Sequence, residues 1–291
     1  MTTHPIEEKV NTFLVKGNTA NEAFVAEFAN TLGESLYEKF YAKVGEVKPF
    51  SLRMSNIGLS LRQLCLQRDY GRTNKLDYFT LHSFYGTMLE CFMLFLLKAS
   101  GVNVEANNKK VQLDVNGYIL PGELDVIIDG AVWDIKSASD YAFTNKFQSY
   151  QSLESDDGFG YLAQGFGYAM AEDKPFGGWI VINKAKGQWK CVTVPASVQK
   201  FYKEKYFREF DEKIKHVTSG APAPKCTGVV PEFFRKKMTG NKILGNGCEW
   251  CSYKDKCHPG YIELPSLLSD AKVKPVKYYT KIDPKYQAKV K

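Results

Sequence analysis

The sequence lacks any apolar stretch long enough to cross a lipid bilayer. A membrane-spanning helix needs about 20 apolar residues, and the best candidate, Leu89–Leu97, is short and contains Glu90. The first residues also lack the basic stretch and apolar segment that form a secretory signal. We therefore expect a cytoplasmic protein, in the host cytoplasm if a phage encodes it, without a membrane partner.

The sequence also lacks the features of a disulfide scaffold or a repeat protein. Its seven cysteines are an odd number, which argues against a disulfide framework in a reducing compartment and favours core residues or metal ligands. No internal repeat or low-complexity tract is visible, and no helicase motif. With 291 residues and 44% hydrophobic content, the chain can bury the core of one large domain or two modest ones.

The charge is unevenly distributed. The net charge is +7, but from Lys225 onward there are 14 Lys and Arg against 6 Asp and Glu. A basic region beside a near-neutral, acid-bearing core is typical of proteins that hold a phosphate backbone with one part and act with another. For the last 20 residues, a solvated tail is the alternative.

Strands grouped between helices predict an α/β fold with a mixed sheet flanked by helices. The expected helices are Ala20–Val44, Ser55–Arg68, Leu81–Ala99, Tyr161–Ala171 and Ala196–Val217. The expected strands are Val111–Val115, Tyr118–Ile128, Ala131–Lys136, Trp179–Asn183 and Trp189–Val194. The segment Ala221–Pro224 is typical of a linker.

One predicted hairpin brings acids face to face. Asp129-Gly130 is a favoured two-residue turn, and it pairs Ile128 with Ala131. Counting outward places Asp125 opposite Asp134, and Glu123 opposite Lys136. Like charges opposed across two strands repel each other unless something positive lies between them, so the register indicates a divalent cation.

A surface hairpin with scattered charges is the alternative to this cation site. The intervening side chains are too apolar for a free surface ribbon, and they favour a strand pair within a core. These residues are Val126, Ile128, Val132, Trp133 and Ile135.

Glu90 is a further candidate, because it lies in a helix that is apolar on most sides. A buried carboxylate is costly unless it is paired or binds a metal. Glu90, Asp125 and Asp134 would offer three hard oxygen ligands, which suit Mg²⁺ or Mn²⁺. Lys136 could then orient an attacking water or stabilise charge on a phosphate. The implied chemistry is hydrolysis.

A second cluster is Cys248-x2-Cys251-x5-Cys257, in a segment too polar for three core cysteines. Thiolates at this spacing indicate a metal site, with Cys65 far upstream as a further cysteine. The spacing alone does not separate zinc from an iron–sulfur cluster.

Four short motifs in this order resemble the RecB-type PD-(D/E)xK nucleases. They are Gly86-x-x-x-Glu90, Gly122-x-x-Asp125, Asp134-x-Lys136 and Gln164-x-x-x-Tyr168. The resemblance implies a restriction-endonuclease-like core, metal ligation by the acids and a catalytic role for the lysine. It also implies that Gln164 and Tyr168, four residues apart on a helix, face DNA. Iron–sulfur members often carry His where this chain has Glu90.

The cysteines extend the resemblance to the iron–sulfur branch, which includes the CRISPR-associated exonucleases and the nuclease domain of AddB. These proteins carry one Cys before the nuclease core and a C-x2-C-x5-C trio behind it, and Ser60–Arg68 resembles the first segment. A 4Fe-4S cluster is therefore implied; its ligands would be Cys65, Cys248, Cys251 and Cys257. The alternative is Zn²⁺ with Cys226 or His258 as fourth ligand. Cys91 and Cys191 are expected in the core.

The leading hypothesis is a metal-dependent DNA exonuclease in recombination, repair, phage DNA metabolism or CRISPR adaptation. A helicase, a recombinase or CRISPR adaptation proteins are candidate partners, and oligomers are known among lambda-exonuclease-like relatives. One alternative is a DNA-binding or assembly factor with a vestigial nuclease site, and another is an endonuclease or nickase. The expected division is an N-terminal helical segment (1–50), the nuclease core (51–217) and a Cys-cluster segment with a basic tail (218–291).

Overall fold

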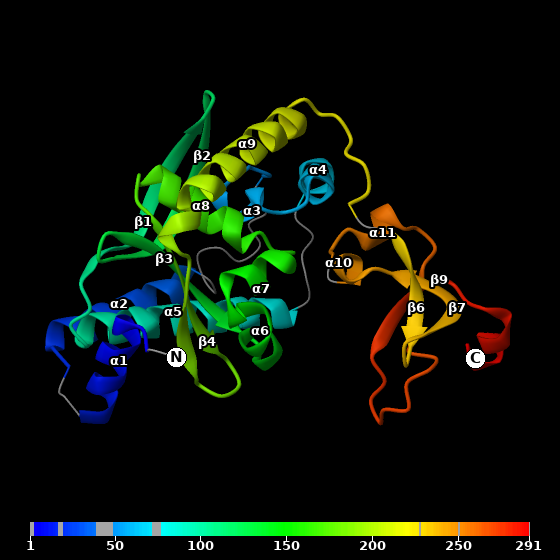
Figure 1. Cartoon of the computed structure of the whole chain (residues 1–291), viewed down its shortest axis with the longest axis horizontal. Coiled ribbons are helices and arrows are strands. Elements are labelled where there is room, and N and C mark those ends of the chain that lie inside the picture. Colours follow the sequence, from blue (N-terminus) through cyan, green and yellow to red (C-terminus); the bar gives the residue numbers. More distant parts are fainter. Residues whose placement is uncertain are drawn as a thin grey trace. The chain divides into compact units, whose positions relative to one another are not determined.

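The computed structural model divides the chain into two units (Figure 1). The first unit comprises Met1–Leu59 and Asn74–Thr218, and the second Ser60–Thr73 and Ser219–Lys291. The residues that the structure describes are 3–16, 20–38, 49–71, 77–226, 228–249 and 251–290.

The first unit is built on a five-stranded mixed sheet in the order β1-β2-β3-β4-β5. All neighbours are antiparallel except β3 and β4, which are parallel. The two tight turns, Asn116-Gly117 and Asp129-Gly130, have positive φ at both residues, as two-residue hairpin turns require. The strands are β1 (Val104–Val115), β2 (Tyr118–Ile128), β3 (Ala131–Ala138), β4 (Phe176–Asn183) and β5 (Trp189–Thr193).

Two groups of helices pack on the sheet. Three of them, α1 (Pro5–Lys16), α2 (Glu22–Tyr37) and α5 (Asp77–Ala99), form the first group. In this group α5 packs on β1 and β3 and is itself covered by α1 and α2. Val126, Trp133 and Ile180 of the sheet bury their side chains with Met93 and Leu97 of α5 in one apolar cluster.

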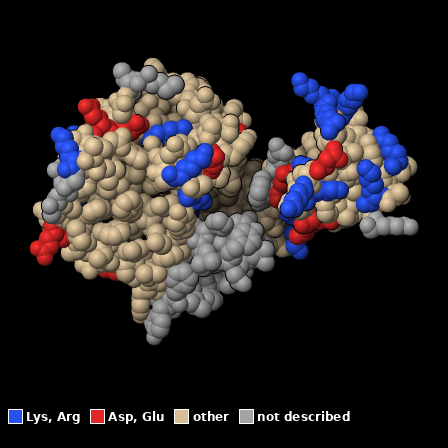
Figure 2. Space-filling view, turned by 90° about the horizontal axis from the view of Figure 1, so that it is seen from below, with Lys and Arg blue, Asp and Glu red and all other residues tan. Residues whose placement is uncertain are grey.

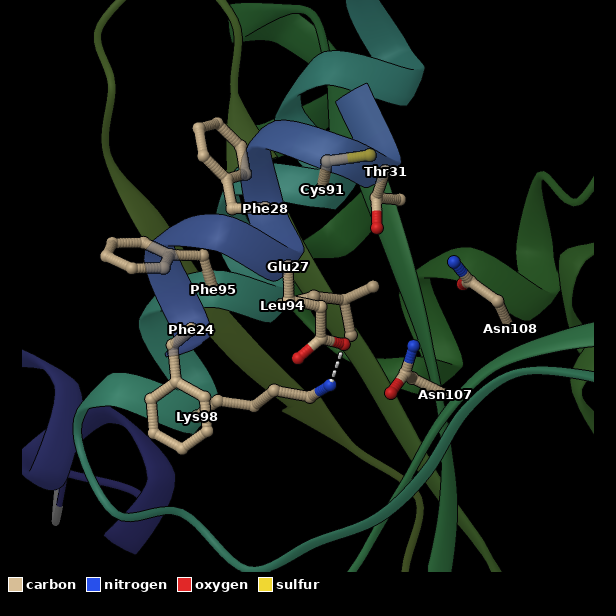
Figure 3. Close-up of a pocket in the computed structure, with 10 residues that line it drawn as sticks. All are labelled: Phe24, Glu27, Phe28, Thr31, Cys91, Leu94, Phe95, Lys98, Asn107 and Asn108. Carbon is tan, nitrogen blue, oxygen red and sulfur yellow. Dashed lines mark hydrogen bonds and ion pairs between the residues drawn. The ribbon is translucent and has the colours of Figure 1, made fainter. Parts of the chain in front are cut away.

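The contact between α2 and α5 is aromatic, with the rings of Phe28 and Phe95 5.6 Å apart. Lys98 also pairs with Glu27 across these helices (Figure 3). The hollow between the two helices and β1 is very small, and the buried Cys91 lies on its wall. Cys91 is therefore a packing residue, as expected. Residues 39–44 of the expected first helix lie outside the described residues.

The second group is centred on α8, which contacts β1, β2, β3 and β4 and is covered by α9 and α3. Short helices connect β3 to α8. The bounds in this group are α3 (Met54–Ile57), α6 (Asp140–Thr144), η2 (Lys146–Gln148), α7 (Tyr150–Ser155), α8 (Tyr161–Ala171), η3 (Ala196–Val198) and α9 (Gln199–Thr218). Together the two groups form a mixed sheet between helices, so the expected α/β class is confirmed.

The expected single helix over Ser55–Arg68 is wrong. The chain forms α3, leaves the helix at Gly58, and starts α4 (Leu61–Tyr70) after Ser60. The hydroxyl of Ser60 accepts a hydrogen bond from the backbone N–H of Gln63, and such a cap starts a new helix. The two helices belong to different units.

The second unit contains a four-stranded antiparallel sheet in the order β6-β7-β9-β8. Its elements beside α4 are β6 (Val229–Phe234), β7 (Lys237–Leu244), α10 (Asn246–Glu249), α11 (Lys254–Cys257), β8 (Ile262–Pro265), β9 (Val276–Lys281) and η4 (Pro284–Lys289). The alternative of a solvated tail is wrong for β9, which pairs with two strands. Among all described residues, no helix is both long and apolar enough to span a membrane.

Candidate active site

The β2–β3 hairpin forms as predicted near its turn and then opens. Ile128 pairs with Ala131, and the ladder continues to Val126 and Trp133. Beyond that point, the backbone N–H of Ile135 donates to Oδ2 of Asp125 at 2.6 Å. A carboxylate therefore takes the place of a backbone acceptor between the two strands.

The other predicted cross-strand pair does not form. Glu123 is exposed and pairs with Lys110 of β1 in the sheet, and the β2–β3 ladder does not reach it. Once β2 and β3 separate beyond Val126, a count outward from the turn no longer places side chains opposite one another.

Asp134 lies at the centre of the site and is fully buried. Its Oδ1 accepts a hydrogen bond from Nζ of Lys136 at 2.8 Å. Its Oδ2 is buried and has no hydrogen-bond donor among the described residues. An unsatisfied, buried carboxylate oxygen is costly, and a bound cation would satisfy it.

The three acids at the site, Glu90, Asp125 and Asp134, have one neighbouring cation, Lys136, whose charge does not offset the effect of burial on their pKa values. Burial, together with the nearby Asp125, raises the pKa of Asp134 to about 7 and that of Glu90 to about 8. Burial also raises the pKa of Asp125. For Lys136, burial opposes the charge, but Asp134 and Asp125 outweigh it and raise the pKa. A further cation would relieve the repulsion among the carboxylates.

The donor atoms at the site fit a hard divalent ion. No three His, Cys, Asp or Glu side chains form a metal-ligand group in the described ranges. Lys136 and the N–H of Ile135 each bind one carboxylate oxygen. The orphaned Oδ2 of Asp134 and the neighbouring Asp125 still offer oxygen to such an ion, and oxygen is what Mg²⁺ and Mn²⁺ prefer. Glu90 is close enough that the charges of Asp125 and Asp134 both raise its pKa.

Helix α8 brings its polar residues to the same place. Nε2 of Gln164 donates to the hydroxyl of Tyr168 at 2.9 Å, so the predicted pair is in contact. Tyr161, in the first turn, holds its ring 5.5 Å from Nζ of Lys136. Tyr161 was not among the predicted site residues, although its spacing of three and seven from the other two places all three on one helix face.

A groove of about 700 Å³ lies beside the site. Tyr168 lines it together with Gly122 and Glu123 of β2, and its wall includes two basic residues, Arg53 and Lys110. A Cβ on Gly122 would lie 2.7 Å from the ring of Tyr168, so only glycine fits there. No pattern in the sequence singles out Arg53 or Lys110, because packing alone brings them to β2.

The four cysteines predicted to bind a cluster all belong to the second unit, but they do not surround one point. Cys248, Cys251 and Cys257 line one small cavity of the second unit. The sulfur of Cys65 instead lies 3.7 Å from the carbonyl oxygen of Ala221. Within the described parts of the chain, no three sulfur or imidazole groups are close enough to hold one metal ion.

The alternative zinc ligands lie nearer to this cavity. Cys226 and His258 both line it, and Nε2 of His258 is 3.7 Å from the sulfur of Cys248. The residues around the cavity therefore agree more closely with the zinc alternative than with a cluster that needs Cys65.

No protein-family model matches the chain, and no curated protein sequence matches it either. Among solved structures, the chain is similar to the crystal structure of SSO0001, with 13% identity and a TM-score of 0.40, over 76% of this chain and 93% of that one. It is also similar to an alkaline exonuclease from Laribacter hongkongensis, with 12% identity and a TM-score of 0.38, over 62% of this chain and 94% of that one. Likenesses this distant carry no argument about function.

Proposed function

We propose that the chain is a metal-dependent deoxyribonuclease that hydrolyses phosphodiester bonds from DNA ends. The observation that carries the proposal is the buried Oδ2 of Asp134, which lacks a donor and lies in a group of carboxylates with raised pKa values. Asp134, Asp125 and Glu90 would hold Mg²⁺ or Mn²⁺. Bound there, the ion would lower the pKa of water and neutralise charge on the phosphodiester.

Lys136 is a charge stabiliser in this proposal and not a base. Its pKa is raised by Asp134 and Asp125 against the effect of burial, so the amine stays protonated at neutral pH. A protonated amine cannot accept the proton of a water molecule. It can orient that water and stabilise negative charge that develops on the phosphate oxygens.

The groove gives the proposed substrate a place to lie. Arg53 and Lys110 would contact phosphates, since cations on a groove wall follow a nucleic-acid backbone. Tyr168, which lines the groove, and Gln164, which binds its hydroxyl, would position the strand. The biological settings proposed for this activity are recombination, repair, phage DNA metabolism and CRISPR adaptation.

Digestion of end-labelled linear DNA, single- and double-stranded, beside closed circular DNA tests this function. Mg²⁺ or Mn²⁺ should support loss of the linear substrates only, and Lys136→Met should lower the rate by at least about 100-fold, as losses of charge stabilisation do. Lys186→Met is the matched control, because Lys186 pairs with Asp140 on the surface and its loss should leave the rate unchanged.

Each other outcome points to one of the alternatives. Cutting of the closed circle would replace the exonuclease with an endonuclease or nickase. Binding of DNA without any metal-dependent cleavage would replace it with a binding or assembly factor.

For the cysteines, we propose a metal centre in the second unit, either a 4Fe-4S cluster that includes Cys65 or zinc that includes Cys226 or His258. Iron, acid-labile sulfide and zinc in anaerobically purified protein separate the two. Cys65→Ser should release a cluster and leave zinc in place, whereas His258→Gln with Cys226→Ser should do the reverse. Protein that contains neither metal would contradict both forms.

A further inference from the structure

One face of the second sheet is exposed and combines cations with apolar side chains. Along β7, Thr239 and Asn241 are buried, whereas the alternate residues Met238 and Lys242 are exposed. Because side chains alternate along a strand, the exposed residues share the opposite face. In Figure 2, Lys and Arg side chains cover much of this unit.

On the buried face, the polar side chains form hydrogen bonds with one another. Glu232 is 4% exposed, and its carboxylate accepts hydrogen bonds from Thr239, Asn241 and Tyr279. Asn241 in turn accepts from the backbone N–H of Asp283. The polar side chains on this side of the sheet are therefore already bound to one another.

Two lysines on the exposed face are direct cross-strand neighbours. Lys242 of β7 pairs with Lys281 of β9, both are exposed, and neither has an ion pair within the described part of the chain. Asp283, two residues after Lys281, lies against Gly240 and pairs with Lys285. Like charges directly opposed on two strands are unfavourable, and an anion between them would remove this repulsion.

The turn of the β6–β7 hairpin contains two more cations, although its backbone conformation favours other residues. Arg235 and Lys236, between β6 and β7, both have positive φ, a conformation that favours Asn and Gly. Arg235 has a loose surface pair with Asp270, at 3.5 Å, and its guanidinium lies 5.2 Å from the centre of the Phe234 ring. Both residues therefore lie at the turn end of the hairpin, next to the Phe233–Met238 pair.

An apolar platform lies between the turn and the lysine pair. Phe233 and Met238 are direct cross-strand partners, and they are 58% and 67% exposed. An exposed aromatic ring on an open sheet, flanked by lysines, is the arrangement on which an unpaired base stacks while its phosphates contact the cations. A duplex keeps its bases stacked inside and cannot use the ring in this way.

We propose that this face binds single-stranded DNA, with one base on Phe233 and Met238 and phosphates at Lys242 and Lys281. The choice of DNA over RNA rests on the proposed nuclease function, whereas the binding face itself does not. The site is distinct from the carboxylates of the first unit, so binding does not require cleavage.

Fluorescence anisotropy with labelled oligothymidine of about 15 nucleotides, a length within the site sizes of single-strand-binding domains, tests the proposal. Full-length protein with Lys136→Met and chelator present prevents cleavage. Lys242→Gln with Lys281→Gln should weaken binding about 10-fold or more at low salt. It should also reduce the slope of log K against log salt by about 1.4, as expected for two lost contacts to a single strand.

The matched control removes the same charge elsewhere in the unit. Lys272 and Lys274 are exposed and lie in the loop before β9, at the end opposite Lys281. Lys272→Gln with Lys274→Gln should change the affinity less than 2-fold. An equal loss in both double variants would overturn the proposal in favour of unspecific attraction to a basic unit.

The aromatic contact has its own test. Phe233→Ala should weaken binding about 5-fold or more, the lower end for one lost base stack, and Phe233→Trp should restore it. Unchanged binding by Phe233→Ala, or equal affinity for a duplex of the same length, would overturn the single-strand proposal. Binding of oligouridine but not oligothymidine would overturn the choice of DNA. Loss of cleavage in the wild-type protein with intact binding would overturn only the nuclease function.

Discussion

At the scale of single residues, Asp134 decides what the first unit can do. A fully buried carboxylate normally has donors for both oxygens, and here Lys136 serves only one of them. The neighbouring Asp125 raises the cost further, because its charge also raises the pKa of Asp134. A site that is unfavourable when empty is favourable when a cation fills it, and this difference can be measured without any substrate.

We predict that Mg²⁺ or Mn²⁺ stabilises the protein and that Asp134→Asn removes the effect. At a metal concentration about 100 times Kd, binding contributes about 2.7 kcal/mol, which raises Tm by roughly 5–10 °C for a unit of this size. The Asn variant should shift by less than about 2 °C in differential scanning fluorimetry.

The control for this prediction is Asp173→Asn. Asp173 is exposed and has positive φ, a conformation that Asn adopts readily, so its metal response should equal that of the wild type. An Asp134→Asn protein that still shifts by the full amount would show that the ion binds elsewhere.

At the scale of elements, α8 shows how closely helix and sheet must approach to form the site. Phe176 of β4 is fully buried, and a Cβ added at Gly165 would lie 2.2 Å from its ring. Bulk at this position would move α8 away from the strands. Tyr161, Gln164 and Tyr168 would move with it, because they share the helix.

We predict that the same substitution has opposite effects in two helices. Gly165→Ala should lower the free energy of unfolding by about 1–3 kcal/mol, as overpacking does, even though alanine favours a helix by about 1 kcal/mol. Gly33→Ala in α2 should raise it by up to about 1 kcal/mol, because nothing lies within 4 Å of the new Cβ. Urea unfolding measures the free energy of unfolding of both variants. A change in the same direction in both would contradict the packing argument.

At the scale of the whole molecule, the second unit is assembled from two distant segments of the chain. Leu66 of α4 packs with Tyr253 and Cys257. The hydroxyl of Tyr253 donates to the carbonyl of Gly71 at 2.5 Å, and Arg62 donates to the carbonyl of Ala223 at 2.8 Å. These contacts join residues 60–73 to residues 219–291, so the burial of Leu66 depends on the later segment.

We predict that a chain ending at Thr218 is poorly soluble, because it exposes Leu66, whose burial is worth about 1.5–3 kcal/mol. A chain ending at Asp283 is the control, since it keeps all four strands of the second sheet and the N–H of Asp283 that binds Asn241. It loses η4 and the two residues after it. The soluble fraction after expression and the thermal unfolding curve compare the two. Equal solubility of both truncated chains would show that α4 does not need the later segment.

The sequence by itself determined the features that depend on neighbours along the chain. The Asp129-Gly130 turn and the alternation on either side of it encode the β2–β3 hairpin, and α8 begins and ends where its pattern predicts. The candidate acids on β2 and β3 and the lysine could be named in advance for the same reason, whereas Gln164 and Tyr168 were named from the resemblance to a nuclease family. Turn and helix geometry require only residues a few positions apart.

Only the tertiary structure decided how these residues meet and what surrounds them. The separation of β2 from β3 lets Asp125 bind the N–H of Ile135, and packing brings Arg53 and Lys110 to one groove. The second sheet also escaped prediction, because its strands carry buried polar residues such as Glu232, whose hydrogen-bond partners lie on β7 and β9. Such contacts join residues that are distant in the chain, and their energies depend on packing that no local pattern records.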